Sequence, residues 1–156
     1  PGDSIKQEYK EDILVGYRWH DTKKIPALFP FGHGLSYTTF TYGKPVASAK
    51  VMAADGTLTV TVAVKNTGSI AGKEIVQLYI GDDKCSVLRP VKELKHFAKV
   101  ALAPGEEKNV TFTLTPDDLK FYDEASAAWK YESGKFKAYV CASSADVRGV
   151  VSFEMQ

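Results

Sequence analysis

The sequence has no long uninterrupted hydrophobic run. Its apolar stretches are about as long as single strands, well short of the ~20 residues that a helix needs to span a bilayer. We therefore expect no transmembrane segment. The chain opens with Pro-Gly-Asp-Ser instead of a basic stretch followed by an apolar one, so no signal peptide is expected within it either.

Neither sign of charge dominates the chain. Lysine and arginine number 20 and aspartate and glutamate 19, for a formal net charge of +1. The charges are scattered along the sequence, whereas binding to phosphate backbones or anionic membrane surfaces depends on concentrated positive charge. Nucleic acid is therefore not expected as a partner.

Cysteine is scarce, with only Cys85 and Cys141 in the chain. The two are far apart and show neither a CxxC motif nor a Cys/His spacing typical of zinc sites. We therefore predict no metal site and no cofactor. Two free thiols are the favoured interpretation, and a single disulfide stays open as the alternative.

The composition is that of one folded domain. The 156 residues are 44% hydrophobic and 25% charged, which is close to the globular average and supplies a core. Residues 1–45 are irregular and rich in aromatic residues, with one short apolar run at Asp12–Trp19. We predict a lone strand there, followed by an extended linker.

From Val46 to Gln156 the pattern changes to short segments of strand composition separated by turn residues. Thr57–Lys65 alternates strictly, as expected for a half-buried strand. Pro116–Leu119 is predicted to form one helical turn between strands. The seven predicted strands are Ala49–Ala53, Thr57–Lys65, Glu74–Ile80, Leu94–Leu102, Lys108–Leu114, Lys135–Ala142 and Val147–Phe153. This number and spacing predict an all-β fold, a seven-stranded immunoglobulin/fibronectin type III-like antiparallel sandwich.

No constellation of catalytic residues stands out. Adjacent acidic pairs occur at Asp82–Asp83, Glu106–Glu107 and Asp117–Asp118, but all lie in predicted turns, where carboxylates are solvated. The three histidines share no ligand spacing, and no nucleophile elbow or phosphate-binding glycine loop is present.

The segment Leu28–Phe40 concentrates aromatic residues in an irregular stretch. A loop cannot expose this much aromatic surface without a partner surface. The favoured interpretation is a linker held between two domains, and the alternative is an aromatic platform for sugar rings.

The stretch Tyr9–Tyr42 resembles the junction before the C-terminal domain of family 3 glycoside hydrolases. The family pattern falls on Tyr9, Glu11, Val15–Arg18 and Phe29–Phe40 and continues through Val64–Gly68, Ala71–Tyr79, Arg89–Lys95 and Leu102–Glu106. The sequence departs from the pattern at Asp12, where glycine is frequent, and at Ser133, where proline is common.

This resemblance implies that residues 1–45 are the terminal strand of a missing α/β sandwich domain plus a linker, and that residues 46–156 are a fibronectin type III-like domain. In isolation, the first segment is expected to be loosely held or paired with another surface. The parent would be a retaining β-glucosidase or β-xylosidase. Its two catalytic carboxylates would lie upstream, so no catalytic residue is assigned in this chain.

The expected role is that of a non-catalytic accessory domain that packs on the catalytic domains of its parent, and the alternative is a carbohydrate-binding module. The resemblance also implies a periplasmic or secreted parent. The predicted interdomain docking residues are Tyr17, Arg18, Phe29, Phe31, His33, Tyr37 and Phe40. The predicted sugar-contacting residues are Trp19, Trp129 and Tyr131.

Overall fold

A computed structural model describes residues 8–156 and is built almost entirely from β-strands. Its helical elements are one helix, α1 (Tyr17–Lys23), and one 3₁₀ turn, η1 (Pro116–Leu119). The strands are β1 (Phe40–Tyr42), β2 (Val46–Ala47), β3 (Val51–Met52), β4 (Leu58–Asn66), β5 (Gly72–Asp82), β6 (Glu93–Leu102), β7 (Glu107–Leu114), β8 (Phe121–Asp123), β9 (Ala128–Lys130), β10 (Gly134–Ser143) and β11 (Asp146–Met155). No helix among the described residues is long and apolar enough to cross a membrane.

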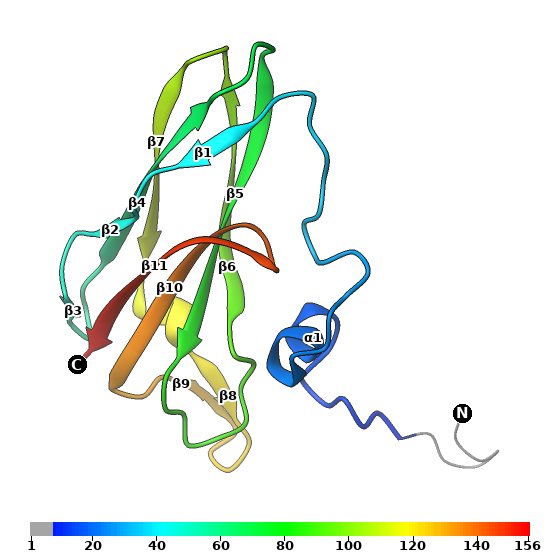
Figure 1. Cartoon of the computed structure of the whole chain (residues 1–156). Helices are drawn as coiled ribbons and strands as arrows, with labels where there is room; N and C mark the ends of the chain where they lie inside the picture. Colours follow the sequence, from blue (N-terminus) through cyan, green and yellow to red (C-terminus); the bar gives the residue numbers. More distant parts are fainter. Residues whose placement is uncertain (1–7) are drawn as a thin grey trace.

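The strands form two sheets that face each other across a core (Figure 1). In the first sheet, β4 pairs antiparallel with β1, β2 and β7. The second sheet has the order β3-β11-β10-β5-β6, which leaves β6 at one edge. A small hairpin of β8 and β9 forms a separate two-stranded sheet.

The core lies between the inward faces of the two sheets. Strand β4 shows why: Leu58, Val60, Val62 and Val64 are buried, while the alternate residues face outward. Strand β5 contributes buried residues from the opposite side. Each large aliphatic side chain buried in this way stabilises the fold by about 1.5–3 kcal/mol relative to an exposed position.

The predicted fold class is confirmed. Each of the seven predicted strands coincides with an observed one, in chain order β3, β4, β5, β6, β7, β10 and β11, and the predicted helical turn is η1. The remaining strands β1, β2, β8 and β9 have two or three residues each. Segments this short carry no readable period, and they form only because a longer strand or a hairpin turn lies beside them.

The structure forms no strand at Asp12–Trp19, and the assignment of this segment to a missing domain stays a prediction. This segment forms turns around residues 10–13 and then enters α1 at Tyr17. A strand needs a hydrogen-bonding partner, and no strand of the described residues runs beside this segment. A helical turn satisfies its own backbone groups locally, as in the bond from His20 N to Gly16 O at 3.3 Å.

The division at residues 45 and 46 stays a prediction, although the first strand of the sandwich, β1, already begins at Phe40. Residues 1–7 of the predicted first segment lie outside the described residues.

Both cysteines are free. Burial raises the pKa of the Cys141 thiol to about 12.

Candidate functional site

The linker that precedes the sandwich, residues 17–39, is fastened to its own domain at several points. The first is Tyr17 of α1. Its hydroxyl accepts a hydrogen bond from the backbone N–H of Leu94 on β6 at 2.8 Å. Its ring packs edge-on against Tyr79 of β5, with the ring centroids 5.5 Å apart. Tyr17, with its ring packed and its hydroxyl hydrogen-bonded, thus joins the helix to the outer face of the second sheet.

The second anchor is an ion pair that is largely shielded from water. Lys92 Nζ lies 2.5 Å from Asp21 Oδ2, and the two side chains are 9% and 15% exposed. The same ammonium group sits 5.5 Å from the centroid of the Tyr79 ring. Beside this pair, Thr22 Oγ1 accepts a hydrogen bond from Val91 N at 3.1 Å. Because both charges are partly desolvated, loss of either one leaves an unpaired buried charge.

The third anchor is the backbone between Phe31 and Gly32. The carbonyl of Phe31 accepts a hydrogen bond from Ser144 N at 2.8 Å. Gly32 has a φ of 79°, and a Cβ at this position would overlap the side-chain amide of Gln77 on β5. A glycine is therefore required both for the backbone conformation and for the close approach to β5.

The last anchor lies just before β1. The hydroxyl of Thr38, which is buried, donates to Asn66 Oδ1 at 2.6 Å, and Thr67 N donates to the carbonyl of Thr39 at 2.8 Å. The linker is thus held along its length by polar and aromatic contacts to the sandwich. Of the two expectations for the first segment in isolation, loosely held or paired with another surface, residues 17–39 follow the second, and the surface is that of the sandwich itself.

The linker exposes large apolar side chains to solvent. We call this set the linker ridge. Its members and their exposed fractions are Leu28 at 89%, Phe29 at 71%, Phe31 at 52%, Leu35 at 94% and Tyr37 at 96%. Figure 1 shows the segment running beside the sandwich, outside both sheets. Apolar groups gathered in this way are typical of surfaces that contact another protein.

The predicted docking residues divide into two groups. Tyr17, Arg18 and Phe40 face the sandwich: Arg18 Nη2 lies 3.6 Å from Glu93 Oε1, and Phe40 packs against the core. The members of the second group are Phe29, Phe31, His33 and Tyr37, and all four are exposed. His33 lies beside Phe29, with 5.6 Å between their ring centroids. The second group is therefore exposed to a partner, whereas the first group is engaged with the sandwich.

The predicted sugar-contacting residues are not brought together. Trp19 is half-buried in α1, with Lys23 Nζ 5.2 Å from its ring centroid. Tyr131 is half-buried against the core. Trp129 is 66% exposed on β9 and packs edge-on against Tyr122 of β8, at 5.7 Å between centroids. Tyr122 was missed because its partnership with Trp129 depends on the hairpin pairing, which no local pattern predicted.

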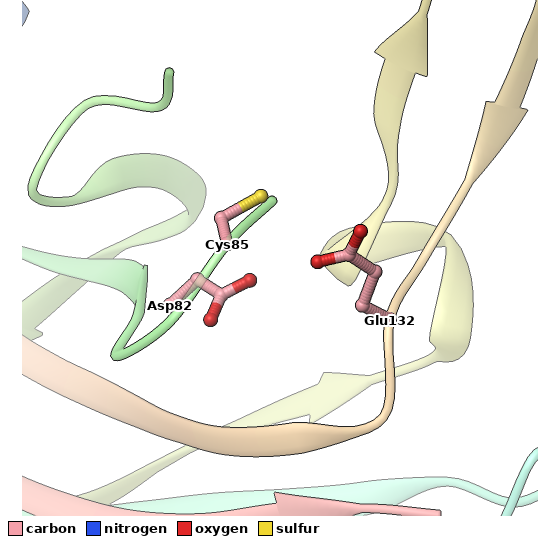
Figure 2. A group of neighbouring side chains, drawn as sticks. All are labelled: Asp82, Cys85 and Glu132. Atoms are coloured by element: carbon pink, nitrogen blue, oxygen red, sulfur yellow. The ribbon is translucent and has the colours of Figure 1, made fainter. Parts of the chain in front are cut away.

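One group of three possible metal-ligating side chains occurs among residues 8–156: Asp82, Cys85 and Glu132, with ligand atoms within 4.8 Å of one another (Figure 2). Asp82 already accepts a hydrogen bond from Lys84 N at 2.9 Å. Glu132 accepts one from Ser86 N at 3.0 Å, and the bonds from Ser86 lower its pKa.

The third member of this group is a poor ligand as it stands. Burial raises the pKa of the Cys85 thiol, whereas the thiolate is the form that binds metals. With both carboxylates already engaged, the three side chains are best explained as polar contacts that hold the loop after β5 to the segment before β10.

The acidic pairs also have local partners. Glu106 accepts a hydrogen bond from Ala103 N at 2.7 Å, and this bond lowers its pKa. Asp117 lies 2.6 Å from Lys120 Nζ, and Asp83 lies 2.7 Å from Lys137 Nζ. These carboxylates stabilise turns and strand ends.

The family model that describes the fibronectin type III-like domain matches residues 74–144. The chain is 67% identical over 154 residues to β-glucosidase BoGH3A of Bacteroides ovatus, covering 99% of this chain and 21% of that protein. It is 52% identical over 147 residues to thermostable β-glucosidase B of Acetivibrio thermocellus, covering 94% of this chain and 20% of that protein.

Solved structures agree with these relatives. The β-glucosidase DesR from Streptomyces venezuelae, in complex with D-glucose, superposes with a TM-score of 0.90 at 42% identity, over 100% of this chain and 20% of that one. The GH3 β-glucosidase of Bifidobacterium adolescentis superposes with a TM-score of 0.89 at 36% identity, over 98% of this chain and 23% of that one. The chain spans about a fifth of the length of the curated relatives it matches. It is thus the C-terminal, fibronectin type III-like region of a family 3 glycoside hydrolase, together with the linker that precedes that domain.

Proposed function

We propose that this chain is a non-catalytic accessory domain that packs on the catalytic domains of a family 3 β-glucosidase and stabilises them. The observation that carries the proposal is that the linker is bonded to the sandwich and still exposes large apolar side chains. It is bonded through Tyr17, Asp21 and Phe31. It presents the linker ridge to solvent.

Burial of the linker ridge by a partner is energetically favourable. Burying apolar surface contributes roughly 25 cal/mol per Å², and the five ridge side chains are more than half exposed. A partner that covers these side chains is stabilised on the chain by the free energy of burying their apolar surface. The linker is already ordered by its anchors, so little additional conformational entropy is lost on docking.

Hydrolysis of the glycosidic bond is attributed to the remaining four-fifths of the parent. The relatives that contain this additional length are β-glucosidases. The reaction requires two carboxyl groups about 5–9.5 Å apart around a substrate-sized cleft. In this chain, carboxylates such as Asp83, Glu106 and Asp117 are paired with nearby lysines or backbone N–H groups on turns.

The direct test is deletion of Val46–Gln156 from the parent enzyme. We expect the melting temperature to fall more than the affinity for substrate, because the deleted part buries surface but contributes no group to the reaction. An unchanged melting temperature, or a loss of activity in a fully folded truncated enzyme, would contradict the proposal.

A finer test replaces two ridge residues. In the parent, Leu35→Ser combined with Tyr37→Ser should lower the melting temperature, while the same changes in the 156-residue chain should leave its melting temperature unchanged, because both side chains are more than 90% exposed there. Val46→Ser is the matched control, since Val46 is 63% exposed on β2, outside the ridge.

A second candidate function is carbohydrate binding at the β8–β9 hairpin. Tyr122 and Trp129 are 49% and 66% exposed and lie opposite each other across the hairpin. Exposed aromatic faces bind the apolar faces of sugar rings. Calorimetric titration of the 156-residue chain with glucose and with β-linked gluco-oligosaccharides tests this function. Saturable binding that Trp129→Ala abolishes would support it. If no heat of binding is detected, the accessory role is the only function that remains proposed.

A further inference from the structure

The outer face of the second sheet carries an exposed apolar pair near the edge strand β6. On β5, Val76 and Leu78 point into the core, so Lys73 and Ile75 point outward. On β6, Ala98 and Val100 pack against the core, so Phe97 and Lys99 point outward. Ile75 is 43% exposed and Phe97 is 68% exposed. We call Lys73, Ile75, Phe97 and Lys99 the β5–β6 patch.

The patch is continuous across the two strands. Ile75 lies directly opposite Lys99, and Gln77 lies directly opposite Phe97. Ile75 and Phe97 are therefore diagonal neighbours on one face, within reach of a single partner surface.

The patch also adjoins the linker ridge. Gly32 of the linker sits against the side chain of Gln77, which is the cross-strand neighbour of Phe97. Leu35 of the ridge and Ile75 of the patch line the same open cavity, which has a volume of about 550 Å³. The ridge and the patch are therefore adjacent, within reach of one large partner surface.

Both charged side chains of the β5–β6 patch are lysines. Lys73 and Lys99 flank Ile75, and neither forms an ion pair among residues 8–156, whereas Lys137 and Lys108 elsewhere on the sheets are paired with Asp83 and Glu106. A partner surface that fits the patch has an apolar centre with carboxylates at its rim.

We propose that the β5–β6 patch is a second contact surface for the catalytic part of the parent enzyme, which meets it with an apolar surface bordered by acidic residues. This inference rests on the proposed accessory function and adds a face of the sandwich to the ridge. The relatives place about four-fifths of their length outside this region, so a large partner is tethered nearby.

A second copy of the chain fits less well. A two-fold interface places the same patch on both sides. Lys73 and Lys99 of one copy would then face the same cations of the other, and like charges across an interface are destabilising.

Chemical labelling tests the inference on unmodified proteins. Lysine acetylation is followed by mass spectrometry in the parent enzyme and in the 156-residue chain. Lys73 and Lys99 should react more slowly in the parent than in the chain alone. Lys65, which is exposed on β4 of the other sheet, is the internal control and should react at the same rate in both. Equal rates for all three lysines would overturn the inference.

Substitution gives an independent measurement. Phe97→Ser should lower the melting temperature of the parent by about 2 °C or more, while leaving the 156-residue chain unchanged because Phe97 is mostly exposed there. Lys99→Glu should act in the same direction through repulsion from the partner's carboxylates. Val46→Ser should change neither protein.

The outcomes separate this inference from the function on which it rests. If the Leu35 and Tyr37 substitutions destabilise the parent and Phe97→Ser does not, the patch inference fails and the accessory function stands. If none of these substitutions affects the parent, both fail. Concentration-dependent dimerisation of the 156-residue chain that Phe97→Ser abolishes would assign the patch to a second copy instead and overturn the inference.

Discussion

At the scale of single residues, the attachment of the linker depends on Lys92. Its ammonium group is 2.5 Å from Asp21 and lies over the ring of Tyr79 in a place with little access to water. Removing Asp21 leaves this charge without its partner, which costs more than the pair itself contributes.

We therefore predict that Asp21→Ala lowers the free energy of unfolding of the 156-residue chain by about 1.5–3 kcal/mol. Urea denaturation measures this effect. Adding Lys92→Met should restore much of the loss, because the buried charge is then removed as well. Lys137→Met, which breaks an exposed pair with Asp83, is the control and should have little effect.

Glu93 supplies a pH-dependent contribution at the same scale. Burial alone would raise the pKa of this carboxyl, but the hydrogen bond from Arg89 and the nearby charges of Lys95 and Arg18 outweigh burial, so its pKa is lowered. A carboxyl with a depressed pKa in the folded state stabilises the fold above its unfolded pKa, and this stabilisation is lost as the pH falls through the folded pKa.

Glu93→Gln is accordingly expected to destabilise the chain at neutral pH and to have less effect in acid. The difference in unfolding free energy from the wild type should shrink below about pH 4.5, the range where unfolded glutamate takes up its proton. Denaturation curves over a pH series check this. A difference independent of pH would show that the ion pairs of Glu93 do not carry its contribution.

At the scale of elements, the linker path is decided at Gly32, where the backbone turns with a φ of 79° against Gln77. We predict that Gly32→Ala destabilises the chain by about 1–3 kcal/mol and increases hydrogen exchange in α1 without increasing it in β10. Gly34→Ala is a close control, because a Cβ at Gly34 meets no atom within 4 Å. Equal effects of the two substitutions would contradict the role assigned to Gly32.

The elements also show which patterns could be read from the sequence. Strands such as β4 and β7 alternate buried and exposed residues, and this period was visible in the residues themselves. Helix α1 has no buried residue, so its sequence shows no apolar period of 3.6 residues from which a helix could be predicted. The apolar residues just before it suggested a strand, but a strand forms only where a partner strand is available.

At the scale of the whole molecule, the linker and the sandwich form one body through the anchors at Tyr17, Asp21, Phe31 and Thr38. Deleting residues 1–31 should leave the sandwich folded, because its core cluster contains no residue before Phe40. It should also lower the melting temperature, since it uncovers Tyr79 and leaves Lys92 without Asp21. Circular dichroism during heating measures both outcomes, and an unchanged melting temperature would show that the anchors add nothing to stability.

The sequence by itself determined the all-β class, the seven main strands and the resemblance to family 3 glycoside hydrolases, because strand period and local motifs are properties of neighbouring residues. Tertiary structure alone decided which aromatic residues face outward, since Tyr17 and Tyr37 differ not in chemistry but in what lies beside them. It also decided the pairing of Tyr122 with Trp129 and the placing of Ile75 and Phe97 as diagonal neighbours. Both depend on which strands pair and in which register, and the periods of the single segments do not encode this.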